Sequence, residues 1–314
     1  MRIAAILLLV AVLIGASPPP ATIESVAKVR EAARHGDAIW PGYSSAPFGF
    51  LLVSDQGEVL LCDERVPDGF VRAARLSGLD CAVATGPKSW RNPSLLAAMP
   101  VFGPGEVIVM GSPAATGLDE EAWRRTALHE HFHQWQGQLP DIYQRLEALG
   151  LAKGDQTGMW MLNYPFPYDK PPVGAAYRAA ADALLAALAA RPEDLPARVG
   201  DYLAKRKAFE ASVSAEEWRY FDFQLWKEGV ARWTEMEVAR RAGGAWAERA
   251  ERDWKALLAD LSTADLAKKQ RVGVYSFGAA EAALFERVDP DWRGCYRAVT
   301  TMSPCWDSLI SVNR

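Results

Sequence analysis

The sequence predicts a mainly α-helical α+β protein with a small β-sheet near its N-terminus. Short apolar runs separated by turn residues are confined to residues 48–110, whereas most of the chain after residue 118 follows helical spacing. The chain has 314 residues, of which 50% are hydrophobic and 24% charged. This composition suits a globular protein of one large domain or two small ones.

The first 16 residues have the pattern of a secretory signal peptide. Met1-Arg2 is followed by an apolar run, Ile3 to Gly15, and by the small residue Ala16. The run is about 13 residues long, which is shorter than the roughly 20 that span a bilayer. Cleavage near Ala16 is therefore favoured over a membrane anchor, and the absence of a cysteine after the run argues against a lipoprotein. We expect an exported protein, periplasmic or secreted.

The charge and the cysteines of the remaining chain are consistent with export. Removing residues 1–16 leaves 34 basic and 39 acidic residues, which argues against nucleic acid or an anionic membrane surface as a partner. Four cysteines in an exported chain predict two disulfides. Proximity in the chain, and nothing more, pairs Cys62 with Cys81 and Cys295 with Cys305. No Cys-x-x-Cys is present, so a cysteine zinc site is not expected.

The N-terminal region, residues 17–117, is expected to contain the sheet. Residues 21–34 have helical spacing and end at a glycine. Residues 48–54 and 58–62 flank Asp55-Gln56-Gly57 and predict a hairpin, which residues 81–84 and 106–110 would extend.

The region from residue 118 to residue 314 is expected to be helical. Asp119 is a plausible N-cap for a helix that runs through residue 136. An aromatic, proline-rich stretch, residues 158–168, interrupts the helices and would either line a cleft or pack into the core. The other predicted helices cover residues 173–190, 196–212, 226–240 and 245–258, with a last one from residue 275.

Three of the four histidines fall within five residues, in the stretch His129-Glu130-His131-Phe132-His133. On a helix, His129 and His133 share one face and can bind the same ion, for which zinc is the natural candidate. Glu130 projects about 100° from His129 and would stand beside the metal as a general base. His131 lies about 200° away, so we expect a structural or supporting role. The alternative is a surface helix that carries this pattern by chance.

Zinc with an open fourth position needs a third protein ligand. No histidine follows His133, so this ligand should be a carboxylate. Glu228 lies on the helix predicted over residues 226–240, and Glu235, seven residues on, shares its face. The alternative for Glu228 is an ordinary i,i+4 pair with Arg232.

These two helices resemble the gluzincin branch of zinc metallopeptidases, whose third ligand is a glutamate on a later helix. The resemblance implies His129, His133 and Glu228 as metal ligands, with Glu130 as base and proton shuttle. Two departures are visible: 95 positions separate His133 from Glu228, and Arg232 stands where the E-x-x-x-D variant has an acid. Glu235 can take that supporting role by accepting the N–H of a ligating histidine.

The resemblance also implies a zincin-like fold, in which the small sheet lies beside the motif helix and its edge strand can hold an extended peptide. Plain scaffolding is the alternative role of the sheet. Tyrosines stabilise the oxyanion in several gluzincins, which makes Tyr275 and Tyr220 the candidates here. The 12 tryptophans would fill the core or build an aromatic cleft, and helical spacing favours the core.

Together these features predict an exported zinc-dependent hydrolase, a peptidase that uses zinc-activated water with Glu130 as general base. Its partner would be a peptide or protein, with no nucleic acid, and no membrane after signal cleavage. Residues 118–314 would be the helical zinc-site region, in one continuous catalytic domain with residues 17–117. Two alternatives keep the same ligands: a non-enzymatic exported zinc-binding protein, and a zinc amidase acting on cell-wall material.

Overall fold

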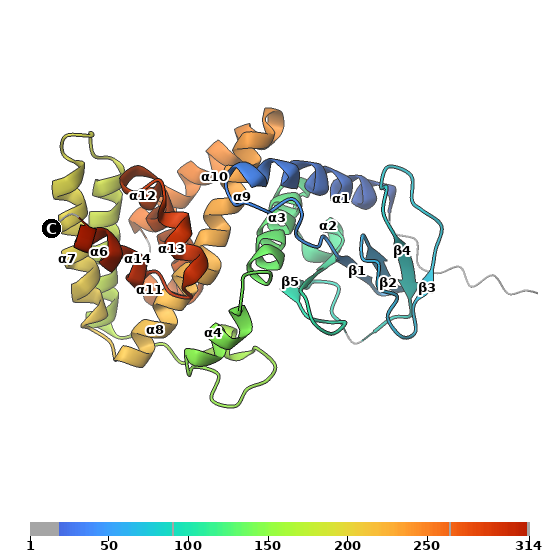
Figure 1. Ribbon diagram of the computed structural model, residues 1–314, viewed down its shortest axis with the longest axis horizontal. Helices are drawn as coiled ribbons and strands as arrows, with labels where there is room; N and C mark the ends of the chain where they lie inside the picture. Colours follow the sequence, from blue (N-terminus) through green and yellow to red (C-terminus); the bar gives the residue numbers. More distant parts are fainter. Residues whose placement is uncertain (1–18, 90, 264, 313–314) are drawn as a thin grey trace, which may run out of the picture.

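A computed structural model describes residues 19–89, 91–263 and 265–312, and within them the protein is mainly helical with one small mixed sheet. The predicted mainly helical α+β class is confirmed at this level. The predicted signal peptide, residues 1–16, lies outside the described residues. Figure 1 shows the sheet at one end of the molecule, most helices at the other, and α3 (Glu120–Gln136) between them.

The sheet has six strands in the spatial order β3-β4-β2-β1-β6-β5. Strands β1 and β6 run parallel, and the other neighbours are antiparallel. The predicted hairpin and its two extensions are present, while β3 and β5 were not predicted. The strands are β1 (Phe50–Ser54), β2 (Gly57–Leu61), β3 (Val71–Arg72), β4 (Val83–Gly86), β5 (Leu96–Met99) and β6 (Val107–Gly111).

Both faces of the central strands are buried. In β1, Phe50 and Leu52 point into the main core, whereas Leu51 and Val53 belong to a smaller apolar cluster on the opposite face. The inner face is covered by helices, and α3 contacts both β5 and β6. The edge strand β5 therefore runs beside the helix that carries the histidines.

The helices that the sequence predicted individually begin and end within about five residues of the expected boundaries, whereas those over residues 142–148, 215–224, 292–298 and 303–312 were not individually predicted. Asp119 caps α3, because its carboxylate accepts the backbone N–H of Ala122. Gly243, with φ 75°, ends α9 as predicted. The remaining helices are α1 (Pro20–Ala33), η1 (Arg34–Ala38), α2 (Pro113–Thr116), α4 (Ile142–Ala148), α5 (Trp160–Asn163), α6 (Pro171–Leu188), α7 (Leu195–Glu210), α8 (Ala215–Gln224), η2 (Leu225–Gly229), α9 (Val230–Ala242), α10 (Gly244–Thr263), α11 (Leu266–Lys269), α12 (Val272–Val288), α13 (Trp292–Ala298) and α14 (Ser303–Val312).

The segment predicted as one helix over residues 226–240 begins in a π-helical turn and not in an α-helix. Helix α8 continues without a break into η2, a π-helical turn, and then into α9. Single π turns often occur at functional sites, because the extra residue shifts the side chains that follow. Glu228 lies on this turn.

Both predicted disulfides are present, Cys62–Cys81 in the sheet half and Cys295–Cys305 between α13 and α14. The tryptophans support the core interpretation. Eight of the described tryptophans are buried: Trp40, Trp123, Trp135, Trp218, Trp226, Trp233, Trp292 and Trp306.

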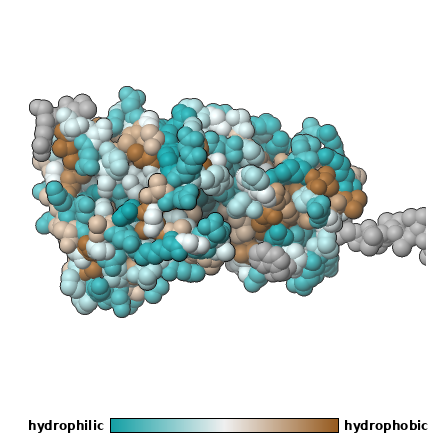
Figure 2. Space-filling view, turned by 60° about the horizontal axis from the view of Figure 1, so that its bottom comes forward, coloured by the Kyte–Doolittle hydropathy of each residue, from teal (hydrophilic) through white to brown (hydrophobic). Residues whose placement is uncertain are grey.

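The surface carries few large apolar side chains. Figure 2 shows one face on which hydrophilic residues predominate and apolar residues appear in small groups. Among the described residues, no helix is long and apolar enough to cross a bilayer. In the part of the chain whose side chains are described, the exposed large apolar residues are Val66, Val71, Tyr143, Met159, Leu162 and Val272.

Candidate metal centre

The described structure brings His129, His133 and Glu228 together. The Nε2 atoms of the two histidines, one turn apart on α3, are 3.2 Å from each other. Oε2 of Glu228 lies 3.2 Å from Nε2 of His129 and 3.5 Å from Nε2 of His133. One ligand atom from each residue falls within 4.8 Å of the others, so this group could hold a metal ion.

Close backbone packing holds the Glu228 turn in place. A Cβ atom added at Gly229 would come within 2.4 Å of the Cα of Gly278 on α12, so only glycine fits at this crossing. The two glycines let η2 lie directly against α12, and Glu228 then reaches the histidines on α3.

Glu235 takes the supporting position expected for it. Its Oε2 lies 3.0 Å from Nδ1 of His129, on the opposite side of the imidazole from Glu228. Arg232 donates to the other carboxylate oxygen of Glu235 at 2.7 Å, and Arg125 lies 3.2 Å from it. Arg232 therefore pairs with Glu235, so the simple pairing of Glu228 with Arg232 is not what the structure adopts.

The charges of this group are strongly coupled. Burial opposes protonation of His129, but hydrogen bonds to Glu228 and Glu235 outweigh it and raise the pKa of this histidine to about 9. Burial likewise opposes ionisation of both glutamates. The histidines hold the pKa of Glu228 well below its usual range, and Arg232 with His129 lowers the pKa of Glu235 to about 2.

Glu130 lies beside this group and is not one of its three converging residues. Its Oε2 accepts the backbone N–H of Ala98, on the edge strand β5, at 2.7 Å. Glu130 also lines an open pocket of about 210 Å³ next to His129. The residues around this pocket are Thr126, His129, Glu130, Arg232, Glu235, Val272 and Tyr275.

Of the two candidate tyrosines, Tyr275 lies at the site. Its ring centroid is 6.0 Å from that of His129, and its hydroxyl oxygen accepts a hydrogen bond from Arg271 at 2.5 Å. Burial and the charge of Glu228 raise the pKa of Tyr275, which keeps the hydroxyl protonated. The hydroxyl of Tyr220 donates instead to the carbonyl of Met161, and Tyr220 does not line the pocket.

His131 points away from the group, as its position on the helix predicts. Its Nδ1 faces Oε1 of Gln134 at 2.9 Å, and its Nε2 faces the carbonyl of Tyr43 at 3.2 Å. Burial lowers the pKa of His131 to about 4. This histidine joins the sheet half to α3 and is buried in the core.

The stretch 158–168 packs against α8. The Trp160 ring lies tilted against Phe223, with a centroid distance of 5.1 Å, and Tyr164 stacks on Tyr220 at 4.3 Å. None of its residues lines the pocket beside His129. Of the two interpretations, core packing describes it.

The sequence did not single out two residues at the site. Oε1 of Gln136 lies 2.7 Å from Nδ1 of His133, and its spacing of three residues from a ligand on the same helix was the available signal. Glu106 precedes β6, and burial raises the pKa of its carboxyl although Lys227 and His133 oppose the shift. Its Oε2 has no hydrogen-bond partner among the described residues. No sequence pattern marks this position.

No protein-family model, curated protein or solved structure matches the chain.

Proposed function

We propose that the protein is an exported zinc-dependent hydrolase of the gluzincin type that cleaves peptide bonds. One observation carries the proposal: His129, His133 and Glu228 converge while Glu130, outside this set, faces the adjoining pocket. A purely structural site would need no acid beside an open position.

The donor set supports zinc. Two imidazole nitrogens and one carboxylate oxygen form the ligand set of catalytic zinc sites that keep a fourth position open. Bound there, zinc would polarise a carbonyl group and lower the pKa of a water molecule towards neutrality. Glu235 would fix His129, because it accepts the Nδ1 hydrogen and leaves Nε2 for the ion.

Glu130 would act as the general base. Its bond to Ala98 fixes one carboxylate oxygen and so orients the group towards the pocket. The carboxylate would accept the proton of the attacking water and return it to the leaving nitrogen. Tyr275 would stabilise the oxyanion, since Arg271 occupies its oxygen as a donor and leaves the phenolic hydrogen to be donated.

The position of β5 supports a peptide substrate. It is the outermost strand beside β6, and its Ala98 N–H faces the base. An extended peptide could pair with such an edge and bring its scissile bond to Glu130.

Export is part of the proposal. The pattern of residues 1–16 supports it, and so do the two disulfides, which form in oxidising compartments. We place the mature protein in the periplasm or outside the cell.

Activity of the mature chain, with and without a chelator, tests the proposal. The zinc-loaded protein should cleave members of a mixed peptide library and lose this activity when zinc is removed. Glu130→Gln is the control variant: it should keep one zinc per chain while turnover falls by roughly 10² to 10⁴, the usual size of a lost general base.

The other outcomes separate the alternatives. Cleavage of peptidoglycan but not of peptides would indicate the cell-wall amidase. Zinc binding without any hydrolysis would indicate the non-enzymatic zinc-binding protein. Elemental analysis that finds no metal after expression in zinc-replete medium would remove the basis of the proposal.

A further inference from the structure

The side-chain amide of Gln136 has only one possible orientation. Its Nε2 lies 3.3 Å from the carbonyl oxygen of Trp226, 3.4 Å from that of Lys227, and 2.6 Å from the hydroxyl of Tyr296. Carbonyl oxygens only accept hydrogen bonds, so the NH₂ end must face them. The amide oxygen then faces Nδ1 of His133, 2.7 Å away.

This orientation fixes the tautomer of His133. Because the amide oxygen can only accept, Nδ1 of His133 carries the hydrogen and Nε2 presents its lone pair to the other two ligands. The same amide holds the backbone of the turn that carries Glu228. Gln136 thus bonds directly to one ligand, His133, and to the two backbone carbonyls that precede another ligand, Glu228.

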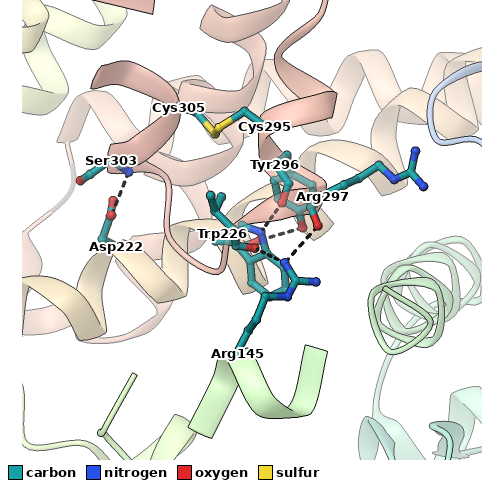
Figure 3. The surroundings of a disulfide bond; sticks show 9 residues. Arg145, Asp222, Trp226, Cys295, Tyr296, Arg297, Ser303 and Cys305 are labelled. Carbon is teal, nitrogen blue, oxygen red and sulfur yellow. Dashed lines mark hydrogen bonds between the residues drawn. A yellow bond between two sulfur atoms is a disulfide. The ribbon is translucent and has the colours of Figure 1, made fainter. Parts of the chain in front are cut away.

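Tyr296 in turn holds Gln136. Its buried hydroxyl accepts from Gln136 and donates to the carbonyl of Trp226 at 3.0 Å. The indole N–H of Trp226 donates back to the carbonyl of Tyr296 at 3.1 Å, and the two rings stack (Figure 3). The two residues are therefore locked together over the Glu228 turn.

A disulfide anchors the short helix that carries Tyr296. Cys295 precedes Tyr296 on α13, and its bond to Cys305 ties this seven-residue helix to α14 (Figure 3). At the C-terminal end of α13, Arg145 donates to the carbonyls of Arg297 and Val299 at 3.0 and 3.3 Å. An isolated helix of two turns is unstable in water, so these attachments hold it in place.

We propose that Gln136 and Tyr296 together set how tightly the centre holds its metal, and we call these two residues the bracket. The Cys295–Cys305 disulfide holds α13, and with it Tyr296, in the position that this requires. The inference rests on the proposed metal centre but not on its hydrolytic activity. Both are positioning residues, since they act through His133 and the Glu228 turn.

The chain contains a matched control for Gln136 and another for the Cys295–Cys305 disulfide. Gln134 is also buried, also three residues after a histidine, and also bonded to a ring nitrogen, but its partner His131 is not a ligand. Cys62–Cys81 is the other disulfide and lies in the sheet half. A general loss of stability would affect the controls as much as the bracket.

The test measures zinc affinity by competition with a chromophoric chelator, and the stability of the metal-free proteins by urea unfolding. Gln136→Met should weaken zinc binding by about 10- to 100-fold, the usual cost of losing a partner of a ligand. Tyr296→Phe keeps the stacking but removes both hydrogen bonds of the hydroxyl, so it should cost about fivefold or more, since one neutral hydrogen bond is worth about fivefold. Replacing Cys295 and Cys305 by serine should weaken binding by at least as much as Tyr296→Phe.

The two controls are Gln134→Met and the variant in which serine replaces both Cys62 and Cys81. Their zinc affinity should stay within about twofold of the wild-type value, because none of these side chains contacts a metal ligand. Equal losses in Gln134→Met and Gln136→Met, at equal cost in stability, would overturn the proposal. So would wild-type affinity in the protein that lacks Cys295–Cys305. If Gln136→Met does not fold, Tyr296→Phe decides, since it removes a single oxygen.

The result is separable from the proposed function. If the wild-type protein cleaves nothing but the bracket variants bind zinc more weakly than it does, the bracket is supported and the hydrolase is refuted. If the wild-type protein is an active hydrolase and the bracket variants bind zinc as tightly as it does, the hydrolase is supported and the bracket is refuted. A wild-type chain that binds no zinc would refute both.

Discussion

Two glutamates reach opposite nitrogens of the same imidazole, and this geometry assigns them different roles. Glu228 faces Nε2 of His129, where an ion would bind, and Glu235 faces Nδ1. Glu235 is also held by two arginines, so its charge is already compensated. Of the two glutamates, only Glu228 is placed to donate an electron pair to an ion bound there.

The first prediction separates these two roles. Glu228→Ala removes a ligand, so zinc affinity should fall by more than the roughly 10- to 100-fold loss typical of a supporting residue. Glu235→Ala should show only that smaller loss. Equilibrium dialysis against a zinc buffer measures both. If Glu235→Ala strips the metal and Glu228→Ala retains it, the ligand has been assigned to the wrong glutamate.

A second prediction concerns the proton on His129. In the metal-free protein Glu228 and Glu235 raise its pKa to about 9, above the ordinary value of 6.5. The stabilisation is complete below about pH 6.5 and is lost as the pH rises through 9. Because an ion must displace this proton, apparent zinc affinity should increase about tenfold per pH unit between pH 7 and 9.

Chelator competition at pH 6.5, 7.5 and 8.5, corrected for protonation of the chelator, measures this slope. The metal-free protein should also lose stability over the same range while the zinc-loaded protein does not. An affinity that is independent of pH would show that His129 is neutral in the metal-free site.

Residue spacing predicted much of the site, because a helix converts spacing directly into direction. The relative directions of His129, His133 and Glu130 follow from the helical geometry of α3 alone. Glu235 was also predicted to accept a histidine N–H. Gln136 follows the same rule but has no motif that marks it. Glu106 comes from a different part of the chain, and its proximity depends on how the sheet packs against α3.

At the scale of elements, helices were easier to predict than strands. Helices α6 and α7 are long enough for their apolar spacing to be visible. Strand β5 has four residues, Leu96–Met99, all partly buried and without alternation, so only its pairing with β6 defines it. The π turn at Glu228 was also not predicted, because no residue pattern marks it; it lies where η2 packs closely against α12.

The third prediction tests this packing. A Cβ at Gly278 would lie 2.6 Å from the Cα of Gly229, so Gly278→Ala must push η2 away from α12. We expect a loss of about 1 to 3 kcal/mol in the free energy of unfolding, the usual cost of overpacking, together with weaker zinc binding.

Gly174→Ala is the control for that substitution. Gly174 lies in α6, and a Cβ there would meet no described atom within 4 Å. Alanine should therefore be neutral or stabilise the helix by up to about 1 kcal/mol, with unchanged zinc affinity. If Gly278→Ala behaves like Gly174→Ala in urea and in zinc titrations, the glycine crossing does not position Glu228.

At the scale of the whole molecule, one buried cation joins the helices behind the site. Arg206 on α7 pairs with Asp222 on α8 and with Glu281 on α12, and it donates to Ser303 at the start of α14. All three charged side chains are buried. Helix α8 leads directly into the Glu228 turn, and α12 packs against it, so this ion group lies behind the metal centre.

The last prediction follows from the cost of an unpaired buried charge. Arg206→Met fills similar space but leaves Asp222 and Glu281 without their cation, so unfolding free energy should fall by about 3 to 5 kcal/mol. Arg198→Met on the same helix is the control: Arg198 is 54% exposed and lies 3.7 Å from Asp201, so its loss should stay within about 0.5 kcal/mol. Urea unfolding measures both. Comparable small losses would mean that the two acids are protonated or hydrated without Arg206, and that the apolar core alone holds these four helices together.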